Sequence, residues 1–259
     1  MTPIPFFQVD AFADAPFTGN PAAVMTLQEW LPDELMQAIA AENNLAETAF
    51  TVPSQAETHD YDLRWFTPTV EVDLCGHATL AAGHILIHGE RVRFMTKSGV
   101  LAVTRDEDLL KLDMPAAPVE PADLPELVEA LGVAGEIFQS KSGNGNTLVL
   151  LDSEAAVRAV KPDFAALRTL PYLVSVTATG NDQDIASRVF AAYHGIDEDP
   201  VTGSAHTALV PFWAERLGRT HFTALQASRR TGVLHCELHE DRVILGGHCL
   251  TVIEGYFQL

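Results

Sequence analysis

The chain has 259 residues, of which 47% are hydrophobic, 35 are acidic and 16 are basic, giving a formal net charge of -19. This length and apolar content suit one large or two ordinary globular domains and argue against a disordered chain. The charge argues against nucleic acid and anionic membranes as partners, and no apolar run approaches the roughly 20 residues that span a bilayer. Three cysteines without metal-ligand spacing indicate a reducing, cytoplasmic setting, and residues 1–7 lack the basic leader of a signal peptide.

The first half of the chain predicts strands with two helices. In chain order we expect a strand at 6–13, a turn-rich segment at 16–21, a helix at 31–44, strands at 48–52 and 61–66, a helix at 76–88, and strands at 91–96, 100–105 and 109–113. The helix at 31–44 is amphipathic. The helix at 76–88 is apolar nearly all round, which is typical of a buried helix.

Four prolines within residues 114–125 predict a linker, and hence two domains, 1–115 and 116–259. The final strand, at about residues 248–259, is a candidate to join the first domain. The second half predicts strands at 136–140, 147–151, 172–177 and 185–192, a hairpin turn at 141–146, a helix from about 204 to 217, and further strands within 231–259. Each half is thus predicted to be a curved, mostly antiparallel sheet around one apolar helix, an α+β fold with two pseudo-symmetric domains.

Two similar segments, at 75–81 and 202–209, open the two predicted central helices. In each, a glycine (Gly76 or Gly203) is followed by a polar residue and then by small, mostly apolar residues. The free N–H groups at such a helix start, together with the helix dipole, favour an anion. The pair predicts a pseudo-symmetric cleft that holds one small carboxylate-bearing molecule from both sides.

Three ionisable residues are candidates for catalysis. Glu47 lies between a predicted helix and an apolar strand, so we expect a carboxylate partly shielded from water, as suits a general acid or base. A solvent-facing helix-end glutamate is the alternative. His77 follows the first motif glycine and is either held neutral at the helix start or a structural histidine. Asp199 precedes the second segment as Asp73 precedes the first, with a plain Asp-Pro turn as the alternative.

Other chemistries find less support in the sequence. Cys75, beside a helix start, could act as a base, but a two-thiol mechanism needs a second cysteine where Thr202 stands. His77, His84 and His88 share a helix face without a carboxylate or cysteine on that run, which disfavours a metal. The chain also has no glycine-rich nucleotide-binding motif.

Six short segments, spread along the whole chain, resemble those of the PhzF-like phenazine-biosynthesis isomerase family. They are FQVDAF at 7–12, FTGNPAAV at 17–24, LAETAF at 45–50, RWFTP at 64–68, VDLCGHAT at 72–79 and DPVTGSA at 199–205. The resemblance implies a diaminopimelate-epimerase-like fold with the active site between two domains, a homodimer and no cofactor. The best-known family reaction isomerises a dihydro-hydroxyanthranilate by moving a proton.

The resemblance also implies roles for individual residues. Glu47 would be the acid/base, assisted by His77 and Asp199. The substrate-binding candidates are Gly76, Gly203, Ser204 and Asn20. Ala46 stands where the family often has Ser, so one ligand contact is absent here. We therefore expect a cofactor-independent isomerase or epimerase acting on a small carboxylic acid, with a non-catalytic binding or scaffold protein of the same fold as the alternative.

Overall fold

The computed structural model describes residues 3–141 and 145–259, which form two compact units. Unit 1 comprises Met1–Asp113 and Gly246–Leu259, and unit 2 comprises Met114–Leu245. Residues 142–144, within the hairpin turn predicted at 141–146, lie outside the described residues. No helix in the described part of the chain has the length and apolar character of a membrane span.

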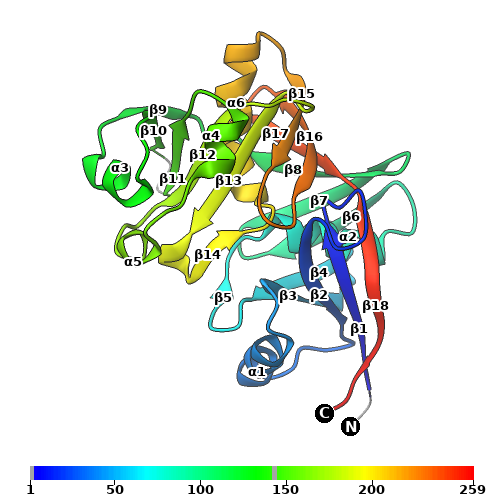
Figure 1. Ribbon diagram of the computed structural model, residues 1–259. Coiled ribbons are helices and arrows are strands. Elements are labelled where there is room, and N and C mark those ends of the chain that lie inside the picture. The colour runs from blue at the N-terminus through cyan, green and yellow to red at the C-terminus, as the bar shows by residue number, and fades with distance from the viewer. Residues whose placement is uncertain (1–2, 142–144) are drawn as a thin grey trace. The chain divides into compact units, whose positions relative to one another are not determined.

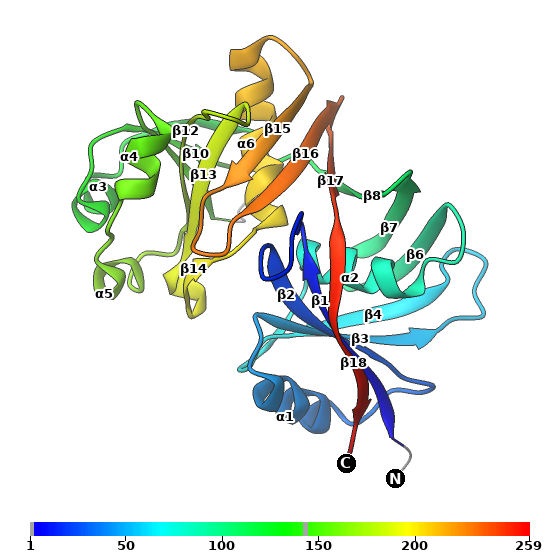
Figure 2. The ribbon, with the colours of Figure 1, turned by 45° about the vertical axis from the view of Figure 1, so that its right-hand side comes forward.

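Unit 1 is a curved sheet in the strand order β18-β1-β2-β3-β4-β6-β7-β8, with the short β5 beside β4. Its neighbouring strands are antiparallel except for β2–β3 and β4–β6. The strands are β1 (Ile4–Ala11), β2 (Asn20–Thr26), β3 (Glu47–Pro53), β4 (Tyr61–Phe66), β5 (Glu71–Val72), β6 (Arg91–Thr96), β7 (Gly99–Asp106), β8 (Leu109–Pro115) and β18 (Cys249–Phe257). Figure 2 shows β18 running beside β1, as their register requires.

Two helices cover opposite faces of the unit 1 sheet (Figure 2). The amphipathic α1 (Asp33–Asn43) packs Met36 and Ile39 onto one face, against Phe50 of β3. The other face holds α2 (Gly76–Leu86), of which nine of 11 residues are buried. A Cβ on Gly83 of α2 would lie only 2.7–2.9 Å from side-chain atoms of Val103 in β7. The absence of a side chain at Gly83 therefore lets helix and sheet approach closely.

Unit 2 has the strand order β9-β10-β11-β12-β13-β15-β16, with β14 also beside β13. The strands are β9 (Val119–Ala122), β10 (Glu136–Ser140), β11 (Asn146–Leu150), β12 (Leu173–Thr179), β13 (Ile185–Ala191), β14 (Ile196–Asp199), β15 (His221–Gln226), β16 (Gly232–His239) and β17 (Arg242–Gly247). The helices are α3 (Pro125–Leu131), α4 (Glu154–Ala159), α5 (Phe164–Leu167), the 3-10 turn η1 (Ala192–His194) and α6 (Gly203–Leu217). In Figures 1 and 2, α3 and α4 lie on the opposite side of the β10–β13 strands from α6.

The two units repeat one chain path. In unit 1, β1–β2 is antiparallel, β2–β3 parallel, β3–β4 antiparallel, and β4 pairs parallel with β6 after the central helix α2. In unit 2, β10–β11, β11–β12, β12–β13 and the β13–β15 pair around α6 follow the same sequence of directions. The predicted fold class, two pseudo-symmetric curved sheets around central helices, is confirmed.

Pro211 lies inside α6 without disrupting the packing of this helix. Proline has no N–H, so the carbonyl of Thr207, four residues earlier, loses its helical partner. That carbonyl instead accepts the N–H of Ala117 at 2.9 Å. A segment expected to be a linker thus takes up the hydrogen bond that the proline removes.

The linker prediction at 114–125 is wrong in part. Residues 119–122 form β9, which pairs with β10, and Pro125 opens α3. Pro121 is tolerated because β9 pairs with β10 alone among the described strands and so lies at a sheet edge. Both central helices are confirmed, and α6 ends at Gly218 in the left-handed conformation.

Candidate active site

The carboxylate of Glu47 and the imidazole of His77 form a close pair in unit 1. Glu47 is the first residue of β3 and His77 the second residue of α2, so sheet and central helix each supply one group. Oε2 of Glu47 lies 3.1 Å from Nε2 of His77, and the two side chains are 13% and 5% exposed. Neither atom has a hydrogen-bond partner among the described residues, so the contact is an ion pair without hydrogen-bond alignment. Glu47 is thus shielded within unit 1, and the alternative of a solvent-facing glutamate is wrong for this unit.

The other ring nitrogen of His77 is held by two neighbours. Nδ1 lies 3.2 Å from Nδ2 of Asn20 and 3.6 Å from Sγ of Cys75. An amide nitrogen only donates, so in the neutral ring Nδ1 accepts and the proton sits on Nε2. In the protonated ring both nitrogens carry protons, so Nδ1 can no longer accept from the amide nitrogen of Asn20, and that amide has to turn its oxygen to the ring instead. A proton therefore faces Glu47 in either charge state.

The charge state of His77 follows from its neighbours. Burial lowers the pKa of His77, but the neighbouring Cys75 and Glu47 together outweigh burial and hold the pKa well above its ordinary value. This direction is opposite to the neutral ring expected from the helix start alone. Burial, with the charge of Glu47 next, raises the pKa of the Cys75 thiol.

A tight turn places Asn20 against His77. Asn20 is fully buried and opens β2 directly after Gly19, whose φ is +70°. A Cβ on Gly19 would lie 2.3 Å from the carbonyl oxygen of Ala11. Only glycine satisfies both the positive φ and this close approach.

The N-termini of both central helices carry no side-chain cap. Gly76 and Gly203 are the first residues of α2 and α6, and neither preceding residue, Cys75 or Thr202, caps its helix. The helices α1 and α3 also lack a side-chain cap, whereas the short helices α4 and α5 are capped by a serine and an aspartate side chain. Because the first-turn N–H groups of a helix have no partner within the helix, those of α2 and α6 can receive an anion.

A buried polar cluster precedes α6 in unit 2. Asp199, 8% exposed, ends β14, and its Oδ2 accepts the hydroxyl proton of Thr202 at 2.5 Å. Gln226, fully buried at the end of β15, bonds to both residues. The sequence identified Asp199 but not Gln226, which is 24 residues from Thr202 and reaches it through the parallel pairing of β13 with β15.

Asn146 is a further residue that the sequence reasoning missed. Its Nδ2 donates to the carbonyl of Ser204, in the first turn of α6, at 3.1 Å. Asn146 opens β11 after Gly145, whose φ is +70°, as Asn20 opens β2 after a glycine with the same φ. The signal in the sequence is the repeated Gly-Asn dipeptide.

The two units differ in their ionisable groups. The side chain of Asp73 is 78% exposed and lies 3.7 Å from Nζ of Lys97, so the predicted equivalence of Asp73 and Asp199 is wrong. Ala22, two residues after Asn20 in β2, pairs with Glu47 of β3, and Leu148, two residues after Asn146 in β11, pairs with Ser175 of β12. Ser175 therefore stands in unit 2 at the position of Glu47. The base candidate is therefore present in unit 1 without a carboxylate counterpart on β12.

Glu47, Cys75 and His77 bring three possible metal-ligating atoms within 4.8 Å of one another. The carboxylate, however, faces Nε2 of the ring and the thiol faces Nδ1. One ion cannot use opposite nitrogens of the same imidazole, so these three groups do not form a shared tetrahedral site in this arrangement.

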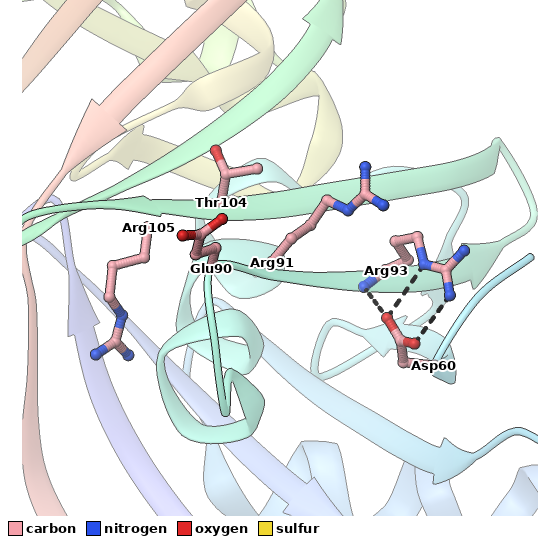
Figure 3. Close-up of a pocket in the computed structure, with 6 residues that line it drawn as sticks. All are labelled: Asp60, Glu90, Arg91, Arg93, Thr104 and Arg105. Atoms are coloured by element: carbon pink, nitrogen blue, oxygen red, sulfur yellow. Dashed lines mark hydrogen bonds and ion pairs between the residues drawn. The ribbon is translucent and has the colours of Figure 1, made fainter.

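A surface pocket of about 620 Å³ in unit 1 gathers none of the predicted site residues. Figure 3 shows Arg93 turned onto Asp60, with Nη2 3.0 Å from Oδ1, and Arg105 pointing away from Arg91 and Arg93. Because the three guanidinium groups diverge, this surface offers no convergent anion site.

The duplicated architecture is that of epimerase-like and isomerase enzymes. A probable proline racemase from Agrobacterium radiobacter has a similar fold, with a TM-score of 0.64 over 99% of this chain and 93% of that one, at 12% identity. A protein of the PhzF family from Enterococcus faecalis is far more similar, with a TM-score of 0.93 and 44% identity over the whole of both chains.

The chain belongs to the phenazine biosynthesis-like protein family, whose model matches residues 9–255. A Pseudomonas aeruginosa protein named an uncharacterized isomerase is 51% identical over 98% of both chains. The resemblance carried by the six sequence segments is thus confirmed, and the protein is an enzyme of the PhzF-like isomerase type.

Proposed function

We propose that the protein is a cofactor-independent isomerase that moves a proton on a small carboxylate-bearing metabolite, with Glu47 as the general acid and base. The observation that carries the proposal is the shielded pair of Glu47 and His77 at the uncapped start of α2. An acidic protein of net charge -19 repels anions at long range, so an anionic substrate needs local donors of this kind.

In this mechanism the first-turn N–H groups of α2, beside Glu47 and His77, bind the substrate carboxylate. Glu47 removes a proton from a substrate carbon, and the electron pair left behind spreads into the adjoining unsaturated group. Glu47 then returns the proton to another carbon, or to the same one. Positioned acid–base groups typically contribute 10²–10⁴-fold, and a pre-aimed N–H donor contributes about 3–4 kcal/mol.

His77 and Asp199 assist in different ways. The raised pKa of His77 supplies a positive charge beside Glu47 and a proton on Nε2 that faces it. In unit 2, Asp199, Gly203 and Ser204 are the candidate substrate contacts, and Asn20 and Asn146 each hold the helix start of their own unit. Since β12 has Ser175 at the position of Glu47 and carries no carboxylate, we favour one base over a symmetric two-base reaction.

Deuterium uptake from heavy water into a panel of candidate acids tests the role of Glu47. Glu47→Gln keeps the shape and removes the base, so uptake should fall at least about 100-fold. Glu42→Gln, an exposed position on α1, is the matched control and should label substrate at the parent rate. Without substrate, Glu47→Gln should also lower the pKa of His77, measured by NMR, because a charge that raises it is gone. Unchanged uptake in a folded Glu47→Gln variant would refute the role.

The same assay separates the competing functions. A scaffold protein would label no acid across a broad panel, whereas an isomerase would label its substrate. A one-thiol epimerase using Cys75 is disfavoured, because burial and the neighbouring carboxylate raise the pKa of that thiol. Cys75→Ala should therefore retain most of the exchange, and its loss would favour the thiol mechanism.

A further inference from the structure

Gln226 makes three hydrogen bonds that together span the turn from β14 into α6. Its Oε1 accepts the backbone N–H of Thr202 at 2.8 Å, and its Nε2 donates to the carbonyl of Asp199 at 2.8 Å and to Oγ1 of Thr202 at 3.1 Å. If the amide of Gln226 were turned over, its NH2 group would face the N–H of Thr202 and its oxygen would face the carbonyl of Asp199. Both contacts would be repulsive, so these two partners fix the orientation of the amide.

This arrangement dictates where the Thr202 hydroxyl proton points. Because Nε2 of Gln226 can only donate, Oγ1 of Thr202 accepts from it and directs its own hydrogen to Oδ2 of Asp199, 2.5 Å away. Threonine at the N-cap position ordinarily turns its oxygen onto the first turn of its helix. Here Thr202 makes no such cap, and the first turn of α6 stays open.

We propose that Gln226 is a positioning residue for the reaction: by orienting the Thr202 hydroxyl onto Asp199, it stabilises the Asp199 carboxylate and keeps the α6 N-terminus open for the substrate. This inference rests on the proposed function of Asp199 and Gly203. A hydrogen bond donated to the charged form of a carboxylate favours that form, and the buried setting strengthens it. Gln226 itself touches no substrate.

Titration of Asp199 in the substrate-free protein tests the proposal, followed through its 13C-labelled carboxyl resonance. Thr202→Val removes the hydroxyl but retains both backbone bonds of Gln226, and Gln226→Glu places an acceptor that draws the hydroxyl away from Asp199. In both variants the carboxyl should titrate at higher pH than in the parent. Thr202→Ser keeps the hydroxyl and should titrate with the parent, a rescue that a merely structural role would not give.

Deuterium uptake into substrate should fall about 10- to 100-fold in Thr202→Val and Gln226→Glu, the typical loss for one hydrogen bond to a charged group. Thr220→Val, at an exposed position of unit 2, controls for the exchange of threonine for valine. A parent-like Asp199 titration in folded Thr202→Val overturns the proposal, whether or not Gln226→Glu folds. The titration of Asp199 needs no substrate, so its result does not depend on the role of Glu47. If Glu47→Gln leaves proton exchange intact, the proposed function is refuted, whereas the role of Gln226 is still decided by the titration.

Discussion

Replacement of Gly83 by alanine tests how closely α2, the helix that carries His77, packs on its sheet. The new methyl would lie 2.7–2.9 Å from Cγ1, Cβ and Cγ2 of Val103, whereas carbon atoms pack at about 3.5–4.0 Å. Val103 is fully buried, and its Cβ is fixed to β7, so a rotamer change cannot relieve all three contacts.

The expected cost combines two opposing terms. Three contacts below 3.0 Å place overpacking in the upper part of its usual range, about 2–3 kcal/mol, and alanine in place of glycine within a helix contributes about 1 kcal/mol of stability. We expect Gly83→Ala to lower the free energy of unfolding by about 1–2 kcal/mol. Val103→Ala, which removes two buried methyl groups, should cost about 2 kcal/mol. In the double variant the contacts with Cγ1 and Cγ2 disappear while the contact with Cβ remains, so the combined loss should fall short of the sum of the two single losses by about 1 kcal/mol.

Urea unfolding followed by tryptophan fluorescence measures these free energies, with comparable m-values as the condition for comparing variants. Gly89→Ala is the matched control, because a Cβ there meets no atom within 4 Å, and it should change stability by less than about 0.5 kcal/mol. A Gly83→Ala variant as stable as the parent, or strict additivity in the double variant, would refute the close packing of α2 on β7.

Two further predictions concern unit 2. Burial lowers the pKa of His206 to about 4 from an ordinary 6.5, so the native ring is neutral while the unfolded chain binds a proton below about pH 6.5. Stability should therefore fall by up to about 3 kcal/mol as pH drops from 6.5 to 4, and His206→Asn should flatten this loss in pH-dependent unfolding; an unchanged slope would contradict it. Arg188 binds Glu198 through two hydrogen bonds, at 2.7 and 2.9 Å, and the carbonyl of Val160 at 2.8 Å. Arg188→Lys should lower the free energy of unfolding by about 2–3 kcal/mol, whereas Arg168→Lys, in the exposed pair with Asp197, should lower it by less than about 1 kcal/mol. Equal losses in the two variants would show that the paired hydrogen bonds of Arg188 with Glu198 add no stability.

The sequence predicted the elements whose patterns are local and long. The apolar run at 76–88 gave α2 almost to the residue, and the strands at 61–66, 91–96 and 136–140 match the observed bounds. The short helices α3 to α5 were missed, because four to seven residues are too few to show a helical period. The proline-rich stretch was read as a linker because edge pairing, which makes Pro121 tolerable, depends on a partner strand elsewhere in the chain.

The sequence predicted those site residues whose surroundings are set by their immediate neighbours in the chain. Gly76 and Gly203, each before a run of small residues, predict the starts of the two central helices. The position of Glu47 beside an apolar strand predicts that its carboxylate is shielded from water. Gln226 carries no such signal, since a glutamine at the end of a strand is ordinary until the fold brings it to Thr202. The raised pKa of His77 was only partly visible in the sequence, because it depends on Cys75, two positions away, and also on Glu47, a carboxylate 30 positions earlier in the chain.

The duplicated fold and the unequal charges together argue for a division of roles. Both central helices begin with a glycine and an uncapped turn, so this form of helix start is common to the two units. Ionisable groups are unequally distributed: α2 presents His77 beside Glu47 of β3, whereas β12 has Ser175 at the position of Glu47 and the buried carboxylate of unit 2, Asp199, ends β14 instead. Two identical bases would suit inversion at one carbon, with removal on one side and return on the other. A single carboxylate suits removal and return of one proton along the same side of a conjugated substrate, which is the chemistry of an isomerase.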